Sequence, residues 1–282
     1  MIKVKVPATS ANLGPGFDAL GLAIDRYNTF TFIESNLEEV ENLIYRSYRK
    51  VFQSLGKPII PVKIRVDGNI PMARGLGSSA ACIVGGIMGA NEILGNPLNK
   101  EDILKLATEI EGHPDNVAPA IYGGLVVSVM EGNRVHIGKL PIKNHLNFIA
   151  LVPNFELSTS KAREVLPKQI DYKDGIFNVG RVSILLTALV TGDNSLLKLG
   201  LQDKFHQPYR GKLIPGFEHI ITTINNIGAL GCYLSGAGPT IMCIGKGEDN
   251  QLIKDIREFM SNQYLGWEVF VHRLDNVGAH LC

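Results

Sequence analysis

Residues 71–94 read PMARGLGSSAACIVGGIMGANEIL, in which a Gly-x-Gly-Ser-Ser turn runs directly into small and apolar residues at helical spacing. Gly75 and Gly77 remove the side chains that would block a polyphosphate, and glycine permits the positive φ values that turn successive N–H groups inward. Ser78 and Ser79 then begin a helix whose unpaired N–H groups and dipole favour an anion. A serine hydroxyl in the first turn can also reach a Mg²⁺ ion that bridges two phosphates. An ordinary glycine turn with a serine-capped helix has the same pattern, so the stretch needs support from other parts of the chain.

Composition narrows the class of partner. The 282 residues include 28 lysines and arginines against 27 aspartates and glutamates, a net charge of +1. This balance argues against binding to nucleic acid or to an anionic membrane and favours a small, discrete partner. The beginning of the chain, MIKVKVPATS, alternates like a strand and lacks the apolar run of a signal peptide, and no stretch approaches the roughly 18 apolar residues of a membrane span. Four scattered cysteines without a CxxC pair indicate reduced thiols in a cytoplasmic protein; they are Cys82, Cys232, Cys243 and Cys282.

Apolar periodicity predicts the elements of the chain. In the first half we expect strands at residues 2–6, 24–33, 62–66, 125–130 and 147–153, and helices at 37–55, 78–94 and 100–110, with Asn36 and Asn99 capping the first and last of these helices. After Pro153 the pattern changes, with helices expected at 160–166, 175–190, 215–227 and 250–260 and strands at 231–234, 240–245 and 267–273. Neighbours that look like hairpins rather than regular βαβ repeats predict an α+β fold, with domains at 1–152 and 153–282.

Two further glycine turns accompany the first. The stretch VPATSANLGPGFDALGLAI, residues 6–24, places polar residues and two glycines between apolar strands, and CYLSGAGPTIMCI, residues 232–244, places a small-residue turn between two strands. Polar residues in such positions are costly unless they are satisfied or functional. With these three turns in this order, the chain resembles the GHMP kinase superfamily over nearly its full length. That family includes galactokinases, homoserine kinases, mevalonate kinases and phosphomevalonate kinases.

The resemblance implies a GHMP kinase fold, with an N-terminal domain like domain 2 of ribosomal protein S5 and a ferredoxin-like C-terminal domain. It also implies that the central turn is the phosphate loop for ATP. The residues expected to bind ATP are Pro71, Met72, Ala73, Arg74, Gly75, Leu76, Gly77, Ser78, Ser79, Ala80 and Ala81. No lysine follows these glycines, so the positive charge for the phosphates must come from the helix dipole, a metal or another cation. Arg74 is either that cation or a solvated or structural arginine.

Three other stretches resemble the homoserine kinase branch of the superfamily: EGHPDNVAPAIYGG at 111–124, LSTSKAREVLP at 157–167 and DKFHQPYR at 203–210. They imply an acceptor pocket formed by Asn12, Asp18, His113, Asn116, Thr159, Arg163 and Arg210. Within it Asp18 and Asn116 are expected to take part in catalysis, and Asp115 and His206 to be structural. Arginine suits the carboxylate of a zwitterionic acceptor because its planar fork can donate two hydrogen bonds. By the same resemblance Ser79 and Glu111 hold Mg²⁺, with Glu109 as the competing carboxylate.

The activity implied by this resemblance is transfer of the γ-phosphoryl group of ATP to the hydroxyl of L-homoserine, a step of threonine biosynthesis. Two alternatives stay open. One is another GHMP kinase with a mevalonate-like or sugar acceptor, and the other is a catalytically silent nucleotide-binding regulator. No motif indicates the oligomeric state, and a homodimer is one assembly compatible with the sequence.

Overall fold

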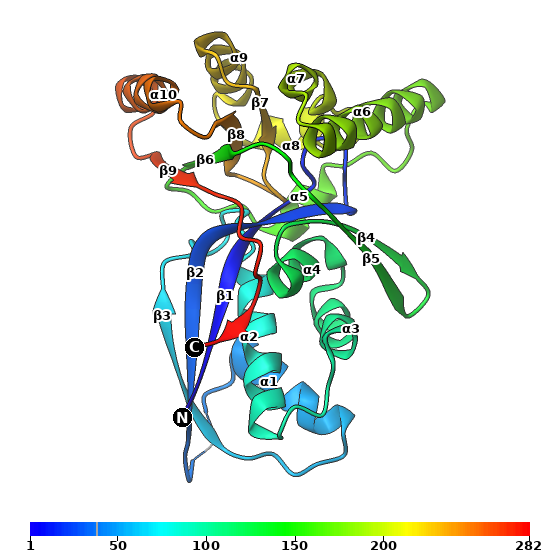
Figure 1. Cartoon of the computed structure of the whole chain (residues 1–282), viewed down its shortest axis with the longest axis vertical. Helices are drawn as coiled ribbons and strands as arrows, with labels where there is room; N and C mark the ends of the chain where they lie inside the picture. The colour runs from blue at the N-terminus through cyan, green and yellow to red at the C-terminus, as the bar shows by residue number, and fades with distance from the viewer. Residues whose placement is uncertain (38) are drawn as a thin grey trace.

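Two antiparallel sheets form the framework, and the computed structural model describes residues 1–37 and 39–282 (Figure 1). The first sheet has the order β10-β1-β2-β4-β5, and β3 pairs with the far end of β2. Its strands are β1 (Ile2–Ala11), β2 (Leu20–Glu34), β3 (Val62–Gly68), β4 (Leu125–Glu131), β5 (Arg134–Leu140) and β10 (His280–Leu281). The second sheet, β7-β8-β6-β9, comprises β6 (Leu146–Val152), β7 (Gly231–Leu234), β8 (Ile241–Lys246) and β9 (Glu268–His272).

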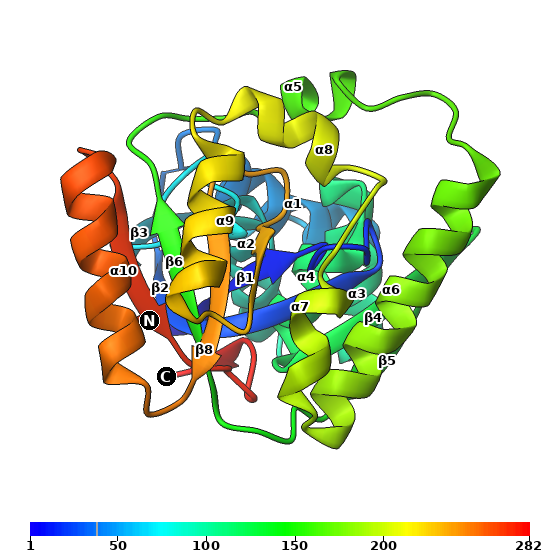
Figure 2. The same cartoon turned by 90° about the horizontal axis from the view of Figure 1, so that it is seen from above.

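The helices divide between the two sheets (Figures 1 and 2). Four lie with the first sheet: α1 (Leu43–Ser54), α2 (Ser78–Ile93), α3 (Lys100–Glu111) and α4 (Pro114–Tyr122). The others accompany the second sheet: α5 (Thr159–Glu164), α6 (Tyr172–Thr191), α7 (Leu197–Gly200), α8 (Gln207–Arg210), α9 (Phe217–Ile227) and α10 (Asn250–Gln263). This segregated mixture of helices and antiparallel strands is the predicted α+β class.

Helix α2 is fixed by close packing on two sides. A Cβ atom on Gly85 would lie 2.4 Å from the ring of Phe30 on β2, and one on Gly86 would lie 2.3 Å from the carbonyl oxygen of Ile44 on α1. The helix is therefore held between sheet and helix at a distance that larger side chains would not allow. Because α2 is apolar or small nearly all round, it is buried along most of its length. Its amino end, which carries the Gly-x-Gly-Ser-Ser turn, is held in place by the same packing.

The predicted start of the first helix is wrong. Helix α1 begins at Leu43 with Asn42 as its cap, whose side chain accepts a hydrogen bond from the Tyr45 N–H. Of the six expected helical residues before Leu43, residue 38 lies outside the described residues. Leu37 and Val40 are 78% and 77% exposed, so their spacing matches no buried face. The Glu39 carboxylate accepts a hydrogen bond of 2.6 Å from the Ile64 N–H, which holds this segment beside β3 in place of a helical turn.

Other elements exceed the prediction. Strands β1 and β2 extend to Ala11 and back to Leu20, and α4 and β5 were not expected at all. Strand β6 precedes the predicted domain boundary, yet it pairs with β8 and β9 in the second sheet. The end of the chain returns in β10 to pair with β1. By hydrogen bonding the chain therefore passes between the sheets twice, and the division at 152/153 stays a prediction.

One helix among residues 1–37 and 39–282, α6, is long and apolar enough by composition to cross a membrane, although the sequence pattern predicted no such stretch. Lys173, Asp174 and Arg181 lie within it. Leu185 of α6 packs directly against Gly200 of α7, where a Cβ atom would lie 2.7 Å from the Leu185 backbone. Because α6 packs against α7, its length and composition are only weak support for a membrane span.

Candidate active site

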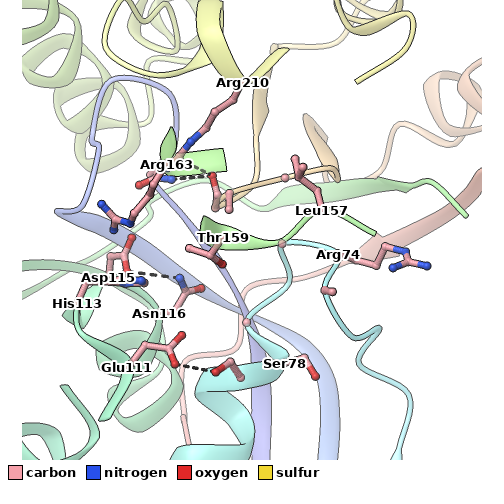
Figure 3. Close-up of a pocket in the computed structure, with 18 of the residues that line it drawn as sticks. Arg74, Ser78, Glu111, His113, Asp115, Asn116, Leu157, Thr159, Arg163 and Arg210 are labelled. Carbon is pink, nitrogen blue, oxygen red and sulfur yellow. Dashed lines mark hydrogen bonds and ion pairs between the residues drawn. The ribbon is translucent and has the colours of Figure 1, made fainter. Parts of the chain in front are cut away.

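A cleft of about 110 Å³, open to solvent, lies where the ends of β1, α2 and α4 meet α5 and the β7–β8 turn (Figure 3). The structure brings all seven predicted acceptor residues and both predicted metal ligands to this one cleft. Its lining consists of Asn12, Asp18, Ala73, Arg74, Gly75, Gly77, Ser78, Ser79, Glu111, His113, Asp115, Asn116, Leu157, Thr159, Arg163, Arg210, Gly236, Ala237 and Gly238. Of the residues expected to bind ATP, Leu76, Ala80 and Ala81 are buried in the core, and Pro71 and Met72 lie outside the lining.

The Gly-x-Gly turn is shaped by two close approaches. Gly75 and Gly77 have φ of +76° and +68°, a region that other residues enter at a cost. A Cβ atom on Gly75 would lie 2.4 Å from the Ser235 carbonyl oxygen, and one on Gly77 would lie 1.9 Å from Thr9 Oγ1. Gly77 is also the N-cap of α2 and supplies no side-chain cap. The first N–H groups of a 16-residue helix are therefore left for a ligand, which makes this turn an anion site.

Beneath the turn lies a buried hydroxyl network that the sequence reasoning missed. Ser235 Oγ donates a hydrogen bond of 2.6 Å to the Gly75 carbonyl oxygen, and Ser10 Oγ lies 2.7 Å from Ser235 Oγ. Both serines are fully buried. Strands β1 and β7 bring them together from opposite ends of the chain. In the sequence, the signal for this network was the presence of polar residues in the ATSA stretch beside an apolar strand. The network connects the second sheet to the phosphate loop.

Arg74 is a structural arginine. Its Nε donates to the Pro153 carbonyl at 3.0 Å, its Nη2 donates to the Asn154 carbonyl at 3.1 Å, and its Nη1 lies 3.4 Å from Glu156. In Figure 3 the side chain points away from the arginines across the cleft. Arg74 therefore connects the loop to the chain that follows β6, and of its two proposed roles the structural one fits the geometry.

Glu111 and Ser79 meet at the mouth of the loop, where Ser79 Oγ donates a hydrogen bond of 2.7 Å to Glu111 Oε2. Burial raises the pKa of Glu111, and the hydrogen bond from Ser79 partly opposes that rise. Glu109, the competing carboxylate, instead pairs with Lys50 at 3.5 Å and lines a separate cleft between α1 and α3. The geometry therefore places Glu111, and not Glu109, beside the phosphate loop.

Asp18 and Arg163 form a two-point ion pair across the cleft. Arg163 Nη1 and Nη2 donate to the two carboxylate oxygens of Asp18 at 3.0 and 2.9 Å. Asp18 has φ of +54°, and Asn12 stabilises this conformation because its Oδ1 accepts the Asp18 N–H at 3.0 Å. The Asn12 Nδ2 donates to the Gly236 carbonyl at 2.7 Å. Both polar atoms of Asn12 are thus used within the protein, and its contribution to the cleft is to hold Asp18.

Arg210 has a different environment. It is 2% exposed, its Nε donates to the Ala162 carbonyl and its Nη1 to the Gly236 carbonyl, and no carboxylate pairs with it among the described residues. Burial, with a further contribution from the charge of Arg163, lowers the pKa of Arg210 to about 10. The ring of Phe17, which the sequence reasoning missed, lies 5.0 Å from the Arg210 guanidinium and 5.7 Å from that of Arg163. Within the described part of the chain this buried cation has no ion-pair partner, and it lines the cleft.

The amino end of α4 supplies the third wall. His113 is the N-cap of α4, and its Nδ1 lies 2.5 Å from Oδ1 of the buried Asp115. Burial disfavours the charged imidazole, yet the hydrogen bond and the charge of Asp115 outweigh it and raise the pKa of His113. Asn116 lies beside them and accepts a hydrogen bond of 2.8 Å from Thr9 Oγ1. Asp115, expected to be structural, is thus in contact with both neighbours that were expected to bind the acceptor.

Two remaining predicted residues lie where the acceptor segments require them. Thr159 is exposed at the start of α5 and lines the cleft. His206, expected to be structural, is fully buried outside the lining, where its Nε2 lies 2.8 Å from the Gly14 carbonyl oxygen and its ring stacks on Phe17. It therefore connects the segment carrying Arg210 to the turn carrying Asp18.

Comparisons with known proteins agree with this geometry. Family models described as "GHMP kinases N terminal domain" and "GHMP kinases C terminal" match residues 42–124 and 185–264. Homoserine kinases of Clostridium beijerinckii and Clostridium botulinum are each 47% identical to the chain over 99% of its length and 98% of theirs. A crystal structure of homoserine kinase from Cytophaga hutchinsonii superposes with a TM-score of 0.90 at 31% identity, covering 100% of this chain and 97% of that one. The Methanococcus jannaschii mevalonate kinase, with a TM-score of 0.74, 18% identity and coverage of 96% and 98%, shares the fold alone.

Proposed function

Because the chain belongs to the homoserine kinases of the GHMP kinase family, we propose that this cleft transfers the γ-phosphoryl group of ATP to the side-chain hydroxyl of L-homoserine. The products are O-phospho-L-homoserine and ADP, as in threonine biosynthesis. One observation carries the assignment of the site. Arg210, a buried guanidinium without a carboxylate partner in the described part of the chain, faces the same cleft as the open amino end of α2. A phosphate site and a carboxylate site thus lie opposite each other.

ATP, the co-substrate of a kinase, places its phosphates against the loop from Gly75 to Ser79. The backbone N–H groups at the start of α2 supply hydrogen bonds and partial positive charge there. Ser235, from below, and Arg74, from the side, hold the loop in position. The helix dipole and Mg²⁺ would supply the positive charge that a lysine after the glycines supplies in other phosphate loops.

Ser79 and Glu111 fit a Mg²⁺ site. Their hard oxygen atoms lie together at the mouth of the loop, and Mg²⁺ in kinases is usually held by one or two carboxylates together with phosphate oxygens and water. Among the described residues no cluster of three His, Cys, Asp or Glu side chains offers a complete metal site, which agrees with an ion that depends on the nucleotide. When bound, Mg²⁺ neutralises charge on the phosphates.

The acceptor is bound as a zwitterion. Arg210 and Arg163 donate to its carboxylate, and Asp18 accepts from its ammonium group. Asp18 and Arg163 also pair with each other, so the two groups of opposite charge that the zwitterion requires already lie side by side. Thr159 and His113 complete the pocket. Such phosphoryl transfers require positioning and charge neutralisation more than covalent chemistry, so Asn116 and Asp18 act by orienting the hydroxyl toward the γ-phosphorus.

The test is ADP release measured with L-homoserine, L-threonine, L-serine and mevalonate under the same conditions. We expect the highest kcat/KM for homoserine and a large loss when the amino group is missing. Preference for mevalonate or a sugar would support a different acceptor, and ATP binding without turnover on any alcohol would support a regulator. A variant Asn116→Ala with unchanged turnover and homoserine KM would contradict the role of Asn116.

We also propose that the protein is cytoplasmic. Its four cysteines are free, and Cys232 and Cys243 remain unpaired although they face each other across β7 and β8. Such thiols are typical of a reducing compartment. A homodimer stays part of the proposal, and sedimentation velocity measures it directly.

A further inference from the structure

We propose that Thr9 is a positioning residue that sets the orientation of the Asn116 amide and connects it to the phosphate loop, an inference that rests on the proposed function of this cleft. Thr9 lies on β1 and is fully buried. Its Oγ1 donates a hydrogen bond of 2.8 Å to Asn116 Oδ1, from 107 positions away in the sequence. Because this buried hydroxyl donates to a side chain that lines the cleft, it can set the orientation of that side chain.

The orientation of the amide follows from its two neighbours. Asn116 Nδ2 lies 3.4 Å from Asp115 Oδ1, and a carboxylate oxygen accepts hydrogen bonds. The amide nitrogen therefore faces Asp115, and the amide oxygen faces the Thr9 hydroxyl. With its oxygen engaged in this way, Asn116 offers N–H donors to the cleft. Through these donors it can bind an oxygen of the acceptor or of the transferred phosphoryl group.

The same residue touches the phosphate loop. The Thr9 N–H donates to the Leu76 carbonyl oxygen at 3.2 Å, and Gly77 approaches so closely that a Cβ atom would lie 1.9 Å from Thr9 Oγ1. Figure 3 shows Asn116 between Glu111 and Asp115, on the side of the cleft where the loop begins α2. Thr9 therefore fixes the distance between the loop that holds the phosphates and the amide that faces the acceptor. Among the described residues, Thr9 alone hydrogen-bonds to both Leu76 and Asn116.

The experiment compares Thr9→Val, which keeps the shape and removes the hydroxyl, with Thr9→Ser, which keeps the hydroxyl. Thr9→Val leaves the Asn116 oxygen without its donor, and we expect kcat for homoserine phosphorylation to fall roughly 5- to 100-fold, the loss that corresponds to one unsatisfied buried polar group. The ATP KM should stay within about twofold of the parent value. Thr9→Ser should restore most of kcat. The matched control is Thr108→Val in α3, because the buried Thr108 hydroxyl has no hydrogen-bond partner among the described residues and its removal should leave the kinetics unchanged.

A double variant separates positioning from general stability. If Thr9 acts through Asn116, Thr9→Val in an Asn116→Ala background should lower kcat by no more than about twofold further. Additive losses, or a Thr9→Val variant with the kcat of the parent, would overturn the inference while leaving the kinase assignment intact. A parent protein that does not phosphorylate homoserine would overturn the proposed function and the inference together. Thermal unfolding of each variant identifies a loss that comes from an unstable fold.

Discussion

The two ends of the cleft are built by different means. At the nucleotide end the ligand-facing groups are backbone atoms: the N–H groups of α2 and the tight turn at Gly75 and Gly77. At the acceptor end they are long charged side chains, Asp18, Arg163 and Arg210, delivered by three separate segments. A backbone site is rigid and tolerates almost no added atom. A side-chain site can rearrange, because its charged groups lie at the ends of rotatable side chains.

This difference predicts that variants at the two ends fail in different ways. Changes at the nucleotide end should damage ATP binding through geometry, and changes at the acceptor end should damage homoserine binding through charge. Four variants test this difference, from the largest expected effect to the smallest.

Arg210→Met should have the largest effect. The guanidinium is buried, and no carboxylate among the described residues forms an ion pair with it. Its removal would therefore leave the carboxylate of the acceptor without a buried charge partner. By analogy with buried interfacial charge pairs, kcat/KM for homoserine should fall roughly 30-fold to several thousandfold. The ATP KM should change little. Steady-state kinetics with each substrate varied in turn measure these constants. Equal losses in the kinetic constants for homoserine and for ATP would contradict the proposed difference between the two ends of the cleft.

Gly77→Ala should damage the nucleotide end. The added methyl group would meet Thr9 Oγ1 and would also occupy a left-handed backbone conformation, so the loop must shift. Misplacement of reacting groups by about 1 Å can cost about 100-fold, which we expect in kcat/KM for ATP. Gly95→Ala is the matched control, since Gly95 has φ of +80° with open space around its Cβ position. The control shares the backbone strain, so a similar ATP defect in both variants would contradict the role of the close contact.

Glu111→Gln should separate stability from activity. The fold raises the pKa of Glu111, chiefly by burial, so the fold favours the protonated carboxyl. Its stabilising contribution is present below the unfolded-state pKa and is lost as pH rises through the raised value. At neutral pH the variant should therefore have a higher Tm than the parent without Mg²⁺. Its apparent affinity for Mg²⁺ in the assay should fall about 10- to 100-fold.

The same proton competition predicts a pH effect in the parent protein. The acid limb of its activity should lie above the pH at which an ordinary glutamate titrates, and it should move to lower pH as Mg²⁺ concentration rises. A Glu111→Gln variant that unfolds at a lower temperature would contradict the raised pKa of Glu111. An acid limb independent of Mg²⁺ would contradict the proposed metal site.

Arg163→Leu should have the smallest effect of the four. Its side chain is 39% exposed and already paired with Asp18, so solvent screens its charge more than that of Arg210. The homoserine KM should rise about 10-fold, in line with one partly exposed charge-assisted hydrogen bond. The ATP KM should stay nearly constant. A loss as large as that of Arg210→Met would show that the exposed arginine, and not the buried one, dominates recognition of the carboxylate.

Much of the fold could be predicted from the sequence. The GHMP kinase fold and the homoserine kinase family are confirmed, and the α+β class followed from local periodicity. Where prediction failed, a tertiary contact decided the outcome. Glu39 pairs with the Ile64 backbone and displaces the expected start of α1, and Asn42 caps the helix where Asn36 was expected to do so.

The candidate site, like the fold, was only partly predictable from the sequence. The residues of the acceptor pocket were named through family motifs, but their relations to one another were not visible. Asp18 and Arg163 are 145 positions apart, Ser235 and Gly75 are 160 apart, and Thr9 and Asn116 are 107 apart. No local pattern encodes a hydrogen bond over such separations. Phe17 gave no signal beyond its place in the GPGFD turn, although it lies against both arginines.

By itself the sequence determined the local shape of the turn at residues 75–78, because positive φ and missing side chains are properties of adjacent residues. Only the tertiary structure decided what the charged side chains do. It buried Arg210 without an ion-pair partner among the described residues and paired Arg163 with Asp18. Burial and charge pairing depend on what surrounds a side chain in space, and a chain acquires those surroundings only when distant strands and helices pack together.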